Sequence, residues 1–193
     1  MKKWPQSQDR AQTGFALSQP GQPAFFDNLG AHPERARKFA SAMSAYSSGP
    51  ENAVSHLCDG YPWEALGPGT VVDMGGSTGY VSVALADRFP QLEFIVQDTP
   101  ETIGKDASTE TPRIKRIAHD LFTPQPVHGA DVYLLRMVLH DFGDADCVRI
   151  LRALIPALKH GAKVVLNEFC LPEPGTAGLF EEKQVRYVPI RLV

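Results

Sequence analysis

Residues 71–79 read Val-Val-Asp-Met-Gly-Gly-Ser-Thr-Gly, an apolar run that ends in an acid and continues into a glycine-rich turn. Glycine adopts positive φ without a Cβ clash and lets the backbone approach a ligand closely. Residues 80–86 have the composition of a helix, whose first N–H groups would face a ligand bound at the turn. This order of strand, carboxylate and glycines predicts a cradle for a nucleotide-like cofactor. Many sharp strand-to-helix turns also use glycine for packing alone, and that alternative stays open.

The spacing of the glycines discriminates between cofactor classes. A dinucleotide fingerprint requires Gly-x-Gly-x-x-Gly, and neither Gly75 nor Gly76 starts such a pattern. The positions that would need glycine hold Ser77 and Tyr80 in one register, or Thr78 and Val81 in the other. What fits is acid-x-Gly-x-x-x-Gly, with Asp73, Gly75 and Gly79 in place. This pattern resembles motif I of class I S-adenosylmethionine (SAM)-dependent methyltransferases, with Ser77 where a middle glycine is usual.

From residue 70 onward, short apolar segments alternate with helical ones. Their near-continuous apolar cores suit parallel strands that are covered on both faces. Alternation of this kind predicts an α/β fold with a doubly wound, mostly parallel, Rossmann-like sheet. We expect strands at 70–74, 93–97, 114–118, 131–136 and 163–168, and helices at 80–88 and 145–158. The apolar face of the last helix is expected to carry Val148, Leu151, Ile155 and Leu158, with Asp144 as its N-cap.

Charge and cysteine content exclude several classes of function. The net charge is −3 with scattered Lys and Arg, so no basic surface for nucleic acid is expected. The three cysteines form no C-x-x-C pair, which argues against a disulfide framework and a zinc site, and we predict no metal. The polar start carries no signal-peptide core, and no segment has the apolar length of a membrane span. We therefore expect a cytoplasmic protein that does not engage a membrane.

Polar residues follow each of the five expected strands. In a sheet of this kind the ligand lies beyond the carboxyl ends of the strands, so these residues are expected to share one site. Singly, each has an equally plausible role as a cap or turn residue. Taken together, polar groups at five successive strand ends indicate a ligand site. In chain order they are Asp73, Asp98, His119-Asp120 with Phe122 close behind, Arg136 with His140-Asp141, and Glu168.

Several stretches resemble the plant caffeate-type and fungal O-methyltransferase family. They are 71–100, 119–122, the phrase Leu134-Leu135-Arg136-Met137-Val138-Leu139-His140-Asp141-Phe142, and 164–172. The segment Phe39-Ala40-Ser41-Ala42-Met43 is also similar to the helix before the cofactor domain of those enzymes. The likeness covers roughly residues 20–182, and the phrase around His140 is its most discriminating part.

The resemblance implies a role for each polar residue at the strand ends. Gly75 and Gly76, in the motif that starts at Asp73, would approach SAM, and Asp98 would bind its ribose. Asp120 and Phe122 would flank the adenine, and Arg136 would lie near the methionine end. His140 would be the catalytic base, and Glu168 would orient it. A His with a pKa of about 6.5 suits the removal of a proton from a phenol with a pKa of about 10. The implied acceptor is a phenolic, enolic or polyketide-like small molecule of secondary metabolism.

The chain departs from the family at both ends. The family's N-terminal winged-helix dimerisation domain has no counterpart here, and residues 184–193 do not match its C-terminal helix, second orienting acid and closing strand pair. We therefore expect a lead-in with helices that pack on the core (1–69), a SAM-binding domain (70–182) and an atypical tail (183–193). The sheet is expected to lack the closing C-terminal strands. The oligomeric state, monomer or irregular dimer, stays open.

These departures keep alternative functions open. One alternative is a catalytically inactive remnant that acts as an interaction protein. Another is a SAM-assisted rearrangement or dehydration without methyl transfer on the same scaffold. A hydride-transferring dehydrogenase is disfavoured by the glycine spacing.

Overall fold

The computed structural model describes residues 3–4, 7, 9–47, 49–103, 111–168, 176 and 178. The expected tail at 183–193 and the expected lack of closing strands fall outside these residues. The helical elements before the sheet are α1 (Gly14–Ser18), α2 (Phe25–Ala31), α3 (Pro33–Ser47), η1 (Pro50–Asn52), α4 (Val54–Gly60) and η2 (Trp63–Leu66). Those that follow are α5 (Tyr80–Arg88), α6 (Pro100–Ile103), η3 (Leu139–Asp141), α7 (Asp144–Leu154) and η4 (Ile155–Ala157).

A five-stranded parallel sheet forms the centre of the fold, as predicted. Its order is β3-β2-β1-β4-β5, and every neighbouring pair is parallel. The strands are β1 (Gly69–Met74), β2 (Leu92–Asp98), β3 (Ile114–Ala118), β4 (Val132–Arg136) and β5 (Lys163–Asn167). Each expected strand lies within one residue of an observed one, because the apolar runs are short and bounded by turn residues.

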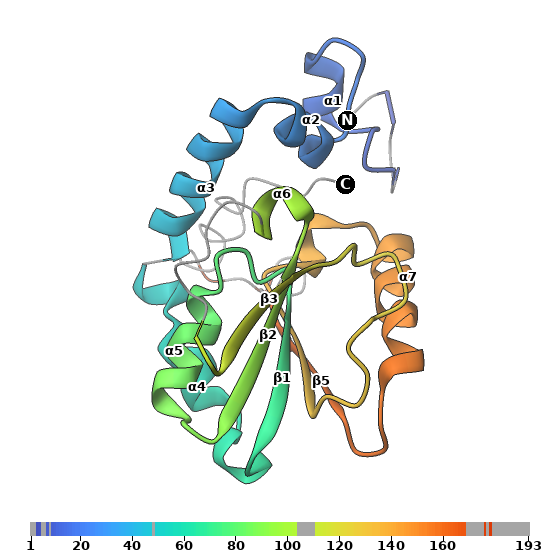
Figure 1. The fold of residues 1–193 in the computed structure, drawn as a ribbon. Helices are drawn as coiled ribbons and strands as arrows, with labels where there is room; N and C mark the ends of the chain where they lie inside the picture. Colours follow the sequence, from blue (N-terminus) through green and yellow to red (C-terminus); the bar gives the residue numbers. More distant parts are fainter. Residues whose placement is uncertain are drawn as a thin grey trace.

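Helices cover both faces of this sheet. Alternate strand residues point to opposite faces, and Val71 and Val72 accordingly belong to different apolar clusters. One cluster joins Val71 and Phe94 of the sheet to Leu85 of α5, and the other joins Val72 to Ile150 of α7. Figure 1 shows α4 and α5 on one side of the sheet and α7 on the other. The result is the three-layered architecture of a doubly wound fold.

The buried face of α7 differs from the predicted one. Ile150 and Leu154 are 0% and 1% exposed, whereas Val148 and Ile155 are 45% and 63% exposed. Leu158 is also exposed, and Leu151 is half-buried. Two neighbouring stripes of α7 are apolar, and the sheet contacts the one that periodicity did not single out. The N-cap is Gly143, so Asp144 is the first helical residue and not the cap.

The first two helices, α1 and α2, lie at the carboxyl end of the strands (Figure 1). Figure 1 shows α6, which follows directly on β2, at the same end of the sheet as α1 and α2. Phe25 of α2 makes edge-to-face contacts with Phe15 and Phe39. Phe39 of α3 is half-buried, whereas Met43 and Tyr46 of the same helix are exposed, so only part of α3 contributes to the core.

Candidate functional site

The turn between β1 and α5 is pinned to the neighbouring strand. The N–H groups of Gly75 and Gly76 both donate to the carbonyl of Gln97 in β2, at 2.8 and 3.0 Å. Gly75 has φ +72°, and Gly79, at φ +83°, caps α5 in the left-handed conformation. Sheet order reverses between β1 and β4, and this turn lies beside that switch point, where ligands of doubly wound sheets bind.

The first two glycines of the turn are required by the protein's own packing. A Cβ on Gly75 would lie 2.8 Å from Val138 Cγ2, beyond β4. A Cβ on Gly76 would lie 2.7 Å from the Asp73 carboxyl and 2.9 Å from Val96 Cγ1. All three distances are shorter than real Cβ contacts, so packing alone explains why both positions hold glycine, the alternative that the sequence left open. Because packing alone accounts for the two glycines, their contact with a cofactor stays a prediction.

Gly76→Ala is expected to destabilise the fold by about 1–3 kcal/mol, because overpacking at a site walled by Asp73 and Val96 forces those groups to move. Gly30→Ala is the matched control, since nothing lies within 4 Å of a Cβ at Gly30 in α2. Alanine favours a helix interior, so the control should be neutral or stabilising by up to about 1 kcal/mol. Urea unfolding of both variants measures the difference, and equal stability for the two would contradict the steric account.

Asp73 is a buried carboxylate beneath the turn. Only 2% of it is exposed, and its Oδ2 accepts a hydrogen bond of 2.7 Å from the Ser82 hydroxyl of α5. The pKa of Asp73 is raised to about 6, because burial, helped by the charge of Asp98, outweighs the lowering effects of the Ser82 hydrogen bond and the charge of Arg136. The carboxylate therefore makes the fold less stable at neutral pH while it anchors the base of the turn.

Asp73→Asn is expected to stabilise the protein at pH 7.5 by up to about 3 kcal/mol. Between the ordinary pKa of 3.8 and the folded pKa of about 6, the unfolded chain releases this proton before the folded chain does. Wild-type stability therefore falls relative to the variant as pH rises through that window, and the difference is constant above it. Urea unfolding should show the advantage of the variant at pH 7.5 and its loss near pH 4. An advantage that does not depend on pH would contradict the assigned pKa, and Asp87→Asn on the exposed side of α5 is the control.

Asp98 ends β2 and holds the turn from the side. Its Oδ2 accepts the N–H of Ser77 at 2.9 Å, and its Oδ1 accepts the N–H of Thr99 at 2.7 Å. Each carboxylate oxygen keeps a second lone pair for another donor. Asp98 is half-buried, so a hydroxyl of a bound ligand can reach it.

Arg136 ends β4 as a buried cation. It is 8% exposed, donates from Nη1 to the Tyr80 hydroxyl at 2.8 Å and from Nη2 to the Asn52 carbonyl at 2.6 Å. Its Nε has no hydrogen-bond partner among the described residues, and no carboxylate there forms a salt bridge with it. Buried charges are normally paired, so this group is suited to an anionic ligand. Sequence reasoning missed Asn52 and Tyr80, although Tyr80 begins the helix after the glycine turn.

His140 and Glu168 meet at the ends of β4 and β5. The imidazole Nδ1 lies 2.8 Å from Glu168 Oε2, and because a carboxylate only accepts, Nδ1 carries the proton and donates it. Glu168 Oε1 accepts two further bonds of 2.7 Å, from the N–H groups of Val138 and Leu139. One carboxylate thus fixes both the ring and the backbone that carries it, and leaves Nε2 with a free lone pair.

A second carboxylate faces the other side of the imidazole. Asp141 Oδ1 lies 3.6 Å from His140 Nε2, so Asp141 lies beside the ring. Burial opposes a charged ring, but the Glu168 hydrogen bond and the charges of Asp141 and Glu168 outweigh it and raise the pKa of His140. Burial raises the pKa of Asp141 to about 6, against the opposing effect of His140.

Asp120 and Phe122 lie in the loop after β3. Asp120 is exposed and its Oδ1 accepts the N–H of Phe122 at 3.0 Å. The Phe122 ring contacts Phe142 edge-to-face at 5.4 Å and lies under the guanidinium groups of Arg149 and Arg10, at 4.7 and 5.3 Å. The proximity of this ring to an adenine stays a prediction.

Most of the predicted residues are linked by direct contacts. Gly75 packs on Val138, and the Val138 N–H donates a hydrogen bond to Glu168. Glu168 in turn accepts a hydrogen bond from His140. On the other side, Asp98 holds the turn through a hydrogen bond to Ser77. Arg136 is joined to Asp73 by no such contact among the described residues, but its charge lowers the pKa of that carboxyl. Among the residues that the structure describes, the hydrogen bonds of Asp120 join it to Phe122 and Thr123 of its own loop. Within the described ranges, no group of three or more His, Cys, Asp or Glu is arranged to hold a metal, and no helix is long and apolar enough to cross a membrane.

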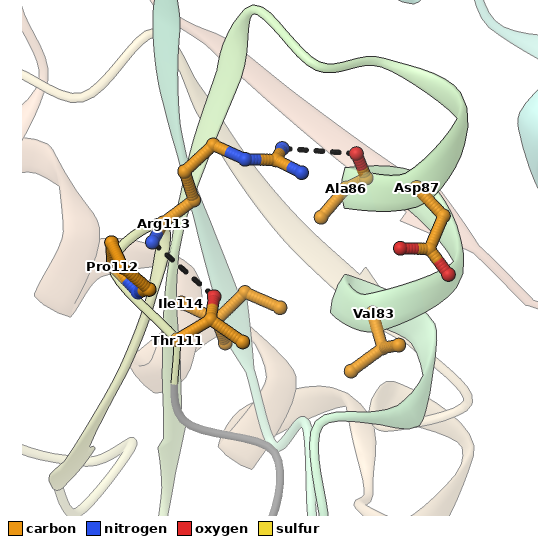
Figure 2. A pocket seen from close by; sticks show the side chains of 7 residues that line it. All are labelled: Val83, Ala86, Asp87, Thr111, Pro112, Arg113 and Ile114. Carbon is orange, nitrogen blue, oxygen red and sulfur yellow. Dashed lines mark hydrogen bonds between the residues drawn. The ribbon is translucent and has the colours of Figure 1, made fainter.

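A pocket of about 450 Å³ lies elsewhere, between α5 and the start of β3 (Figure 2). Arg113 on its wall already donates to the Ala86 carbonyl at 2.9 Å. Because α5 runs back from the glycine turn, this pocket is at the amino end of the strands. It is therefore not the ligand site of a doubly wound sheet.

Comparison with known sequences decides the family. The profile of the O-methyltransferase domain matches residues 9–188, nearly the whole chain. The chain belongs to the O-methyltransferase family. It is 46% identical over 179 residues to the grayanic acid biosynthesis cluster O-methyltransferase of Cladonia grayi, covering 90% of this chain and 40% of that protein. It is 42% identical over 196 residues to the chlorophenol O-methyltransferase of Trichoderma longibrachiatum, covering 96% and 42%. The chain thus spans less than half the length of these relatives.

Several solved structures share the fold. The complex of LepI with SAM matches with a TM-score of 0.76 and 28% identity, over 90% of this chain and 46% of that one. NcsB1, an O-methyltransferase from neocarzinostatin biosynthesis, was solved with SAM and 2-hydroxy-5-methyl naphthoic acid. It matches with a TM-score of 0.69 and 27% identity, over 81% and 47%.

Proposed function

We propose that this chain carries the catalytic site of a SAM-dependent O-methyltransferase that acts on a phenolic or enolic hydroxyl of a small molecule. The observation that carries the proposal is the His140–Glu168 pair, which lies one contact away from the glycine turn through Val138. Relatives in fungal secondary metabolism and a neighbour solved with SAM and a hydroxynaphthoic acid support it.

The residues around the turn fit SAM. SAM supplies an electrophilic methyl group on a sulfonium and presents a carboxylate, an amine, ribose hydroxyls and a purine. Arg136, a buried cation whose Nε has no hydrogen-bond partner among the described residues, suits the carboxylate at the methionine end. Asp98 keeps lone pairs for ribose hydroxyls, and Gly75 and Gly76 would lie along the cofactor over Asp73. Asp120 and Phe122 would border the adenine.

His140 is proposed as the base and Glu168 as the residue that orients it. The free Nε2 takes the proton of the acceptor hydroxyl, and the negative charges of Glu168 and Asp141 stabilise the imidazolium that results. Methyl transfer is an in-line displacement, so fixed positions of the base and the acceptor supply much of the rate.

The acceptor is proposed to be a phenolic or polyketide-like aromatic, and we infer a cytoplasmic setting. The named relatives include a chlorophenol O-methyltransferase, and the neighbour NcsB1 was also solved with 1,4-dihydroxy-2-naphthoic acid. A second candidate, SAM-assisted rearrangement without methyl transfer, is favoured by one match: a structure described as a pericyclic reaction enzyme, with a TM-score of 0.76 and 27% identity.

Two measurements test the proposal in sequence. Calorimetric titration with SAM and NAD should show binding of SAM alone, and absence of SAM binding would remove both SAM-based candidates. A screen of chlorophenols and hydroxynaphthoic acids with SAM should then yield methyl ethers. Conversion of an acceptor without loss of methyl from SAM would favour rearrangement, and SAM binding without turnover of any acceptor would favour an inactive remnant.

A further inference from the structure

Arg116 is a charged residue in the interior of β3, between Lys115 and Ile117. It is 8% exposed, and its Nη2 donates to the carbonyl of Ser77 in the glycine turn at 3.0 Å. Its Nε and Nη1 are buried without a hydrogen-bond partner among the described residues. A buried guanidinium with unpaired N–H groups destabilises a fold. A contribution to stability is therefore a poor explanation for the presence of Arg116. Its hydrogen bond to the glycine turn is a better explanation.

Ser77 has a backbone conformation that needs support. Its φ is +52°, a left-handed value that is unfavourable for a residue with a Cβ. Its N–H is held by Asp98 Oδ2 from β2, and its carbonyl by Arg116 from β3. Both polar groups of this residue are thus fixed by side chains of two different strands, 21 and 39 positions away in sequence.

We propose that Arg116 is a positioning residue that holds Ser77 in the left-handed conformation and so keeps the glycine turn in the shape that receives the cofactor. Arg116 acts through the Ser77 carbonyl and makes no contact with the reacting groups. Without the guanidinium, Ser77 can relax toward negative φ, which moves the peptide groups next to Gly76 and Gly79. As far as it concerns SAM affinity, this inference rests on the proposed function.

The test compares Arg116→Met with Lys115→Met. Methionine keeps an apolar stem of similar length, and Lys115 is the exposed neighbour on the same strand, so the control removes one positive charge without touching the turn. Three quantities are measured on the whole chain: the Kd of S-adenosylhomocysteine by calorimetry, the Tm, and the exchange rate of the Ser77 amide hydrogen in cofactor-free protein. For Arg116→Met we expect binding about tenfold weaker and exchange about tenfold faster, since one charge-assisted bond is lost. The Tm should be unchanged or higher because two buried nitrogens, Nε and Nη1, which have no hydrogen-bond partner among the described residues, are removed.

The outcomes separate this inference from the proposed function. Unchanged affinity and exchange in Arg116→Met would overturn it, as would a loss of affinity accompanied by a large fall in Tm, which indicates a general structural role. If the wild type binds no S-adenosylhomocysteine, the proposed function fails. In that case the inference is tested by the exchange rate of the Ser77 amide hydrogen alone. A rate in Arg116→Met equal to that of the wild type overturns it.

Discussion

His140→Ala is expected to slow methyl transfer by about 10²–10⁴-fold, the usual contribution of a positioned general base. SAM affinity should be nearly unchanged, because Arg136 and Asp98 do not depend on the ring. Glu168 keeps its bonds to Val138 and Leu139 in this variant, so the loop beyond β4 should hold its position. The measurements are kcat/KM for a phenolic acceptor and the Kd of SAM.

His128→Ala is the control for this variant, since His128 lies exposed in the loop before β4. The pH profile gives a second check, because only the neutral ring accepts a proton. The pKa of His140 is raised above 6.5, with Glu168 and Asp141 outweighing burial, so wild-type kcat/KM should rise with pH on a limb centred above 6.5. Turnover of His140→Ala at the wild-type rate would remove His140 from the mechanism.

Glu168→Gln is expected to cost about 10²–10⁴-fold in kcat while the fold is retained. The amide oxygen of the variant can still accept the N–H groups of Val138 and Leu139. Its NH₂ group then faces His140 Nδ1 and donates a hydrogen bond to it, so the ring proton moves to Nε2. Nε2 is the nitrogen that must take the proton from the substrate hydroxyl. The wrong tautomer is thus enforced in an otherwise native site.

Two further variants make the Glu168 prediction specific. Glu101→Gln, on the exposed surface of α6, should leave kcat unchanged. Glu168→Ala leaves the two backbone N–H groups unpaired and should lower the unfolding free energy by about 1–3 kcal/mol for each, whereas Glu168→Gln should not. Wild-type kcat in Glu168→Gln would show that orientation of the ring by this carboxylate is not required.

The sheet and the positions of the site residues were predictable because they depend on local patterns. The apolar runs of β1 to β5 are bounded by turn residues, and parallel strands bring their carboxyl ends to one edge. The contact of His140 with Glu168 also follows from the pairing of β4 with β5, together with the resemblance to a known family. Asp120 and Phe122 were located in the correct loop, but their proximity to a cofactor remains a prediction.

The errors come from choices that only tertiary contacts make. Both Val148 and Ile150 lie on apolar stripes of α7, so helical periodicity could not tell which stripe meets the sheet. The contacts of Arg136 with Asn52 and of Ser77 with Arg116 join residues 84 and 39 positions apart, beyond any local pattern. The two adjacent charges Lys115 and Arg116 inside strand 114–118, of which alternation turns one toward the core side, were the sequence signal that could have pointed to Arg116.

The central claim is that His140 promotes methyl transfer from SAM to a hydroxyl. The most direct test is mass spectrometry of a phenolic acceptor after incubation with SAM that carries a trideuterated methyl group. The account predicts a deuterated methyl ether with wild type and almost none with His140→Ala, although both proteins bind SAM. Equal labelled product from the two proteins, or conversion of the acceptor by wild type without the label, would contradict it.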